Sequence, residues 1–160
     1  MKQLSDTSGA AGAARLAIVA AFSLLTAIAG VFTMPPLDRD EARFAQATAQ
    51  MLESGDFVTI RFQAEERNKK PAGIHWLQAA SVSVFSSTEA REIWAYRLPS
   101  VLGAVLAALF TYVAGARLFS PAAGFLAALL LASAPALAGE ATIAKTDAML
   151  LACVAGAQAA

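Results

Sequence analysis

Two acidic residues, Asp40 and Glu41, come shortly after the first long apolar run of the chain, and two lysines, Lys69 and Lys70, close a later charge cluster. A carboxylate can act as a general base, orient a hydroxyl group or bind a metal ion. A lysine ammonium can bind an anionic group such as phosphate. Each pair also has a plain structural explanation. The two acids would complement the dipole of a helix that begins there, and the lysines would form a solvated charge run or contact lipid headgroups. Residue spacing alone does not decide between these roles.

The composition places these residues in a membrane protein. Of the 160 residues, 58% are hydrophobic and 15% charged, whereas a soluble domain is closer to half apolar and a quarter charged. The 12 basic residues balance the 12 acidic ones, which argues against a nucleic-acid-binding protein with a basic face and against a disordered chain. The single cysteine, Cys153, excludes an intrachain disulfide framework and a multi-cysteine zinc site.

The charges are gathered in one segment. Seventeen of the 24 charged residues lie between positions 35 and 97, and uncharged runs occupy 16–37, 98–116, 118–139 and 148–160. About 20 apolar residues cross a bilayer as a helix. We therefore expect an all-α, polytopic membrane protein. It would have three complete transmembrane helices, over 16–34, 98–116 and 121–138, and a truncated fourth that begins over 147–160. The first run is longer than the apolar core of a usual signal peptide, so we expect it to be retained.

The basic residues outside the charged segment predict the orientation. With the N-terminus inside, Lys2, Arg15 and Arg117 all lie in the cytoplasm. Residues 1–15 then form a cytoplasmic N-terminus, and residues 35–97 form a long outer loop. Apolar periodicity in this loop predicts amphipathic helices at about 40–54 and 71–86, whose plain role is to lie on the membrane surface. The single histidine, His75, is expected to be a packing or interfacial residue.

Four short motifs follow one another along the chain. They are residues 40–45 (DEARFA), 69–77 (KKPAGIHWL), 97–100 (RLPS) and 146–151 (TDAMLL). In this order and spacing they resemble the motifs of bacterial GT-C membrane glycosyltransferases, the relatives of aminoarabinose transferase and protein O-mannosyltransferase (glycosyltransferase family 39). The second motif departs at Ala72, where the family often has another proline. The resemblance covers nearly the whole chain and is specific at the level of the family.

The resemblance implies a reaction and its partners. A sugar would pass from a polyprenyl-phosphate donor to a lipid A-like glycolipid or a protein, at the periplasmic face of the bacterial inner membrane. Membrane lipids, the donor and the acceptor are thus the expected partners, and nucleic acid is not. Family members are much longer, so the resemblance implies that this chain is an N-terminal fragment that is inactive alone.

The resemblance also implies roles for individual residues. The candidate catalytic carboxylates are Asp40, Glu41 and Asp147. The candidates for binding the donor phosphate are Lys69, Lys70, Arg97 and Arg43. Arg43 follows Asp40 by one helical turn, so a pairing with that carboxylate is an equal alternative. Asp40 and Glu41 are also the tentative ligands of a divalent metal ion (zinc, magnesium or manganese), among which the sequence does not choose.

Two other functions compete with the enzyme. The first is a small non-catalytic membrane anchor or assembly protein whose outer loop binds a partner, and the sequence leaves this alternative open. The second is part of a transporter. Transporters usually place polar or broken-helix sites near the membrane midplane, whereas the apolar runs of this chain are free of charge and the charges gather outside them.

Overall fold

Helices account for most of the structure, which is a computed structural model. It describes residues 2–37, 39–67 and 69–160, with side chains from residue 10 onward. The elements in chain order are α1 (Lys2–Ile28), α2 (Arg39–Ser54), β1 (Arg61–Phe62), β2 (Glu65–Glu66), α3 (Gly73–Phe85), α4 (Ile93–Leu118), α5 (Pro121–Ala132), α6 (Pro135–Ala141) and α7 (Asp147–Ala159). The strands form one antiparallel hairpin, with Arg61 opposite Glu66. The described chain is therefore mostly helical, and this hairpin departs from the expected all-α class.

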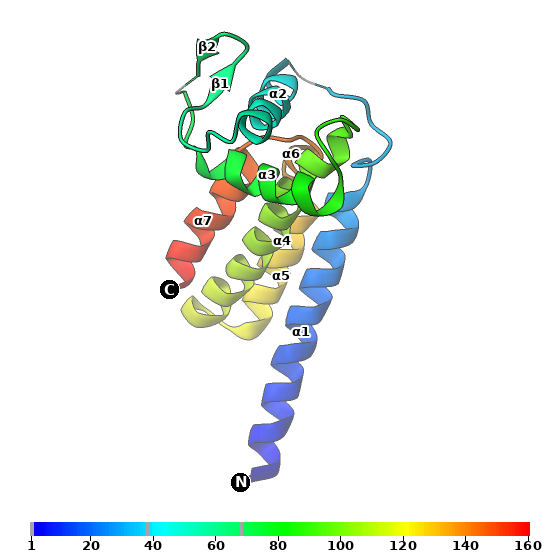
Figure 1. Cartoon of the computed structure of the whole chain (residues 1–160). Helices are drawn as coiled ribbons and strands as arrows, with labels where there is room; N and C mark the ends of the chain where they lie inside the picture. Colours follow the sequence, from blue (N-terminus) through cyan, green and yellow to red (C-terminus); the bar gives the residue numbers. More distant parts are fainter. Residues whose placement is uncertain (1, 38, 68) are drawn as a thin grey trace.

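Helix α4 is the centre of a helical bundle. It packs against α1, α5 and α7, while α2, α3 and the hairpin lie across one end of the bundle (Figure 1). The contact surfaces are rich in alanine, and small residues let helix backbones approach closely. A Cβ added to Gly103 of α4 would lie 2.6 Å from the backbone nitrogen of Met149 in α7. This close packing of α4 on α7 fixes where the first turn of α7 lies.

Two of the described helices are long and apolar enough to cross a membrane. They are Ala10–Ile28 within α1, with a mean hydropathy of 1.9, and Ile93–Leu118, with a mean hydropathy of 1.8. A helix rises about 1.5 Å per residue and a bilayer core is about 30 Å thick, so both lengths are adequate. Helices α5 and α6 pass the same test only as a pair bent by 61°. The described residues thus give two candidate spans, or three if the bent pair is one.

The expected single helix over 121–138 is broken after Ala132. Ala134 is extended, with φ −66° and ψ 124°, because a residue before proline is disfavoured in the helical conformation. Pro135 then opens α6, where its fixed φ and missing N–H cost nothing. Helix α7 is an apolar helix of 13 residues. Three full spans and the start of a fourth are therefore not clearly present.

The charged segment 35–97 contains α2, the hairpin and α3, in the region where two amphipathic helices were expected. Helix α2 buries Phe44, Ala47 and Met51 against α3 and the hairpin. Its first turn carries Asp40 and Glu41, which complement the helix dipole. This small lobe therefore holds the first candidate motif at the end of the bundle.

Candidate functional site

Glu41 and Arg97 form a fully buried ion pair, although 56 positions separate them in the sequence. Arg97 Nε donates to Glu41 Oε1 at 2.7 Å, and an Nη2 hydrogen reaches Glu41 Oε2 at 3.1 Å. The remaining guanidinium hydrogens reach the carbonyl oxygens of Val31, Met34 and Pro35. Arginine has five N–H donors, so every donor of Arg97 is used.

The carboxylate of Glu41 is equally saturated. Besides Arg97, its oxygens accept hydrogen bonds from the backbone N–H groups of Leu37 and Ala144, each at 3.0 Å. Burial raises the pKa of Glu41, but the hydrogen bonds from Arg97, Ala144 and Leu37 outweigh it and leave the pKa below its ordinary value. Glu41 is therefore an ionised group with no acceptor position left for a ligand.

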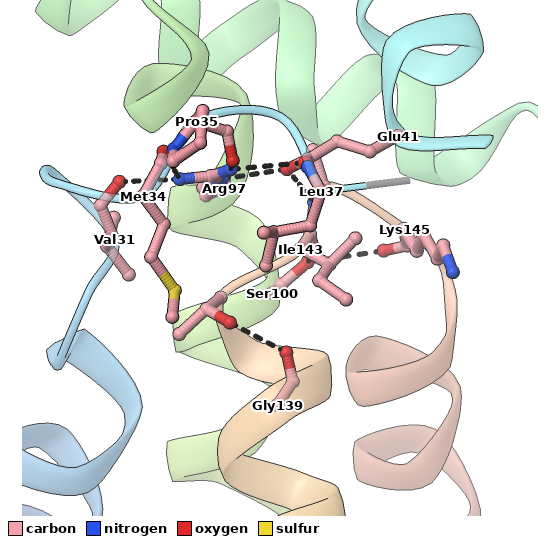
Figure 2. Close-up of polar contacts among 12 residues, drawn as sticks. Val31, Met34, Pro35, Leu37, Glu41, Arg97, Ser100, Gly139, Ile143 and Lys145 are labelled. Atoms are coloured by element: carbon pink, nitrogen blue, oxygen red, sulfur yellow. Dashed lines mark hydrogen bonds and ion pairs between the residues drawn. The ribbon is translucent and has the colours of Figure 1, made fainter. Parts of the chain in front are cut away.

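This ion pair joins four segments of the chain: the turn after α1, the start of α2, the first turns of α4 and the turn before α7 (Figure 2). Ser100, one turn after Arg97, adds to the same junction by donating to the carbonyl oxygen of Ile143 at 2.7 Å. The turn that follows leads into Asp147, the first residue of α7. The junction therefore holds the segments that carry Asp40 and Asp147 at the same end of the bundle.

Asp40, next to Glu41, lies at the surface. Its side chain is 51% exposed and forms ion pairs with Arg43 at 3.3 Å and with Arg67 at 3.6 Å. The pairing of Arg43 with Asp40 is the structural alternative that the sequence left open. The two neighbouring acids thus differ in exposure to solvent. Asp40 is accessible between two guanidinium groups, whereas Glu41 is buried.

A stack of side chains lies beneath the surface that carries Asp40, between α2 and α3. The guanidinium of Arg67 lies 6.0 Å from the ring centre of Phe44, which in turn stacks on His75 at 5.2 Å. The hydroxyl of Thr48 contacts His75 Nδ1 and donates to Gln78 Oε1, both at 2.8 Å. Because the one hydroxyl proton goes to Gln78, the neutral His75 donates from Nδ1. The stack therefore holds α2 against α3, and this contact fixes the position of Asp40 at the start of α2.

His75 is itself a buried packing residue, with 2% of its surface exposed. Burial lowers its pKa to about 4, and the positive charge of Arg67 acts in the same direction. The imidazole is consequently neutral near neutral pH.

The remaining candidates are exposed. Lys69 and Lys70 precede α3 at the surface, and neither forms an ion pair with a described residue. Asp147 is exposed at the N-terminal end of α7. The two lysines are thus accessible to an anionic ligand, whereas a direct contact between Arg97 and a phosphate would require the buried junction to open.

Asp40 and Glu41 do not fit a metal site as a pair. The oxygens of Glu41 are filled by hydrogen bonds, and its side chain is buried while that of Asp40 is exposed. Within residues 2–37, 39–67 and 69–160, no group of three or more His, Cys, Asp or Glu side chains could hold a metal ion.

Comparison with known proteins decides the family. Residues 69–159, more than half of the chain, match the family described as dolichyl-phosphate-mannose-protein mannosyltransferase (PMT_2). The chain belongs to this family. The resemblance to GT-C glycosyltransferases that the four motifs predicted is therefore confirmed. No solved structure matches significantly.

The chain is also similar to individual bacterial members of the GT-C group. It is 33% identical over 134 residues to undecaprenyl phosphate-α-4-amino-4-deoxy-L-arabinose arabinosyl transferase 2 of Pseudomonas fluorescens, covering 79% of this chain and 22% of the relative. It is 32% identical over 133 residues to the corresponding transferase of Pseudomonas paraeruginosa, covering 79% and 24%. The chain therefore spans about a quarter or less of the length of these curated relatives.

Sequence reasoning missed Arg67 as a site residue. It belongs to the charge cluster before Lys69, and the hairpin brings it to α2 through the hydrogen bond from its backbone N–H to the carbonyl oxygen of Ile60. Its separation from Asp40 in the sequence gave no signal of this contact.

Proposed function

We propose that this chain is part of a membrane glycosyltransferase that moves a sugar from a polyprenyl-phosphate donor to a lipid A-like glycolipid or a protein. The membership of the PMT_2 family supports the reaction class. The names of the similar bacterial transferases favour a pentose, 4-amino-4-deoxy-L-arabinose, as the sugar. The observation that carries the proposal within this chain is the accessible carboxylate of Asp40 between Arg43 and Arg67.

The chemistry requires a carboxylate and positive charge close together. The bond between the anomeric carbon and the donor phosphate oxygen breaks, and a bond to the acceptor oxygen forms. Asp40 orients the acceptor hydroxyl and accepts its proton. The departing phosphate gains negative charge, which nearby cations stabilise. Lys69 and Lys70 are accessible for that purpose, with Arg43 beside Asp40. Asp147 is the second carboxylate of the site.

Glu41 and Arg97 serve this site as positioning residues. Their hydrogen bonds are all used inside the protein, so they act by holding the segments of Asp40 and Asp147. A divalent cation at Asp40 remains a prediction of the sequence, because it would need ligands from outside the pair Asp40 and Glu41.

We place the chain in the bacterial inner membrane with its N-terminus in the cytoplasm. Residues 35–97 then lie in the periplasm, where the donor sugar and the acceptor meet. The candidate spans support the membrane location, and the basic residues Lys2, Arg15 and Arg117 support the orientation. The 160 residues alone are expected to be inactive.

The substitution Asp40→Asn tests the proposal in an enzyme that contains residues 1–160. We expect transfer from an undecaprenyl-phosphate aminoarabinose donor to fall by about 100-fold or more, the usual contribution of a general base. The matched control is Asp56→Asn, because Asp56 lies in the same loop and uses its side chain to hold the turn at Val58 and Thr59. Wild-type turnover by the Asp40→Asn protein, at an equal level in the membrane, would contradict the proposal.

A further inference from the structure

The amide side chain of Gln50 in α2 pairs with the backbone of Gln63 in the hairpin turn. Gln50 Nε2 donates to the carbonyl oxygen of Gln63 at 3.0 Å, and Gln50 Oε1 accepts from the N–H of Gln63 at 2.7 Å. A carboxamide carries a donor and an acceptor in one plane, so it meets both backbone groups of one residue as a neighbouring antiparallel strand would. Helix α2 therefore holds the tip of the hairpin by its backbone.

Gln63 needs this support because its backbone is strained. Its φ is +59°, in the left-handed region that glycine adopts readily and other residues adopt rarely. It is the first of the two turn residues, Gln63 and Ala64, that join paired strands of two residues each. An isolated two-stranded hairpin is marginally stable at best. The conformation of this hairpin therefore depends on its contacts with α2.

The hairpin in turn brings Arg67 to Asp40. The N–H of Arg67 donates to the carbonyl oxygen of Ile60 at 2.8 Å, which extends the pairing of the two strands by one position. Ile60 is buried against Ala47 and Met51 of α2, and the Arg67 guanidinium reaches the Asp40 carboxylate at 3.6 Å. The hairpin is thus attached to α2 at its base as well as at its tip, and its position decides where the guanidinium lies.

We propose that Gln50 is a positioning residue of the transfer reaction, which places Arg67 beside Asp40 by holding the hairpin tip on α2. This inference rests on the proposed function, in which Asp40 is the catalytic carboxylate. The side chain of Asp40 is 51% exposed, so packing restricts its rotamer little and its ionic partners decide where the carboxylate points. A displacement of about 1 Å in a reacting group can lower a rate by about 100-fold. Gln50 thus acts on the reaction from ten residues further along the helix.

The first test follows the hairpin tip in the 160-residue chain in detergent micelles. In a Cys153→Ala background, Ala64→Cys carries a nitroxide spin label on the exposed turn, and the EPR line shape reports how freely the turn moves. Gln50→Ala should narrow the lines. Gln50→Glu keeps the acceptor and loses the donor, so it should narrow them less. The matched control is Gln63→Ala, which removes an amide that takes no part in the two bonds and should leave the line shape unchanged.

The second test measures kinetics in an enzyme that contains residues 1–160. Gln50→Ala should lower kcat by about 10-fold or more and leave KM within about 2-fold, because the misplaced carboxylate affects the transition state and not substrate binding. Adding Gln63→Gly to this variant should restore most of kcat and the wild-type line shape, because glycine adopts the turn conformation without support. Gln63→Ala should again behave as the wild type.

Three results would contradict the proposal. An unchanged line shape in Gln50→Ala, or a loss of kcat that Gln63→Gly does not restore, would overturn it. Wild-type kcat in Gln50→Ala beside an inactive Asp40→Asn enzyme would overturn the role of Gln50 and leave that of Asp40 standing. Wild-type kcat in both variants would overturn the proposed function as well, so the two failures are distinguishable.

Discussion

The neighbouring carboxylates Asp40 and Glu41 have opposite surroundings, and their surroundings decide what each can do. Asp40 is half exposed beside two arginines, so it can meet a substrate. Glu41 is fully buried, and its oxygens accept four hydrogen bonds from inside the protein. A buried ion pair gains stability only when its remaining hydrogen-bonding groups are satisfied, and this pair meets that condition on both sides. Glu41 therefore contributes through the position of its neighbours.

The substitution Glu41→Gln should destabilise the chain strongly. It leaves the Arg97 charge buried without a counter-charge, a change that costs about 3–5 kcal/mol in comparable pairs. Unfolding of the chain in micelles, followed by tryptophan fluorescence, measures the loss. Glu89→Gln is the matched control, because Glu89 is exposed and its substitution should change stability by less than about 0.5 kcal/mol. Equal stability of the two variants would show that the buried pair does not hold the junction.

The buried His75 predicts that the lobe formed by α2, the hairpin and α3 loses stability in mild acid. The unfolded chain takes up a proton near pH 6.5, but the folded protein resists protonation until about pH 4. Stability is therefore fully present above pH 6.5 and falls as the pH decreases toward 4, by about 2 kcal/mol between about pH 7.5 and about pH 5. Glu41 loses its contribution only at lower pH, because its pKa lies below the ordinary glutamate value.

Unfolding at these two pH values, in the wild type and in His75→Asn, measures this effect. An asparagine amide can donate to Thr48 as His75 does, but it does not titrate between these pH values. The variant should therefore lose most of the pH dependence. The same dependence in both proteins would assign the acid sensitivity to another group.

The motifs singled out Asp40, Glu41 and Arg97 as candidate site residues but did not show which of them are exposed. The structure brings all three to one end of the bundle, with Asp40 at the surface and the other two buried. The burial of Glu41 and Arg97 could not be predicted from the sequence. It depends on the contact of Arg97 with a turn more than 60 positions away, at Val31 and Pro35. The contact of Arg67 with Asp40 was hidden for the same reason, since the hairpin that makes it consists of two-residue strands.

At the scale of elements, the expected single helix over 121–138 overlooked a local signal for the break between α5 and α6, whereas the packing of α7 has no local signal in the sequence. Pro135 is a local signal for a helix start, and its effect on Ala134 is a property of the dipeptide. The close approach of α4 and α7 depends instead on Gly103 meeting the backbone of Met149. A glycine within an apolar run does not reveal which helix it will face.

The substitution Gly103→Ala should weaken the packing of α7. Its methyl group would lie 2.6 Å from the backbone nitrogen of Met149, so α7 must shift, and overpacking of this kind costs about 1–3 kcal/mol. Gly139→Ala is the matched control, because nothing lies within 4 Å of the added Cβ and alanine favours a helix. The thermal unfolding midpoint in micelles should fall for Gly103→Ala and stay equal or rise for Gly139→Ala. The opposite order would contradict the close approach of α4 and α7.

At the scale of the whole molecule, the charged residues that cluster in the sequence also cluster at one end of the structure. The segment 35–97, with 17 of the 24 charges, lies at and across one end of the bundle, and the turn between α4 and α5 lies at the other end (Figure 1). Apolar side chains such as Leu25, Leu126 and Leu130 remain exposed along the bundle, as is expected where a bilayer surrounds it. The two ends should therefore face opposite sides of the membrane.

Cysteine labelling decides which end faces the periplasm. In a Cys153→Ala background, Ala64→Cys places a thiol on the exposed hairpin and Phe119→Cys places one in the exposed turn after α4. Arg117 beside that turn favours the cytoplasm. A membrane-impermeant maleimide should therefore label Ala64→Cys in intact spheroplasts, and Phe119→Cys only after permeabilisation. The reverse pattern would put Asp40 in the cytoplasm, away from a periplasmic donor sugar. Labelling of both positions in intact spheroplasts would mean that the two ends of the bundle do not lie on opposite sides of the membrane.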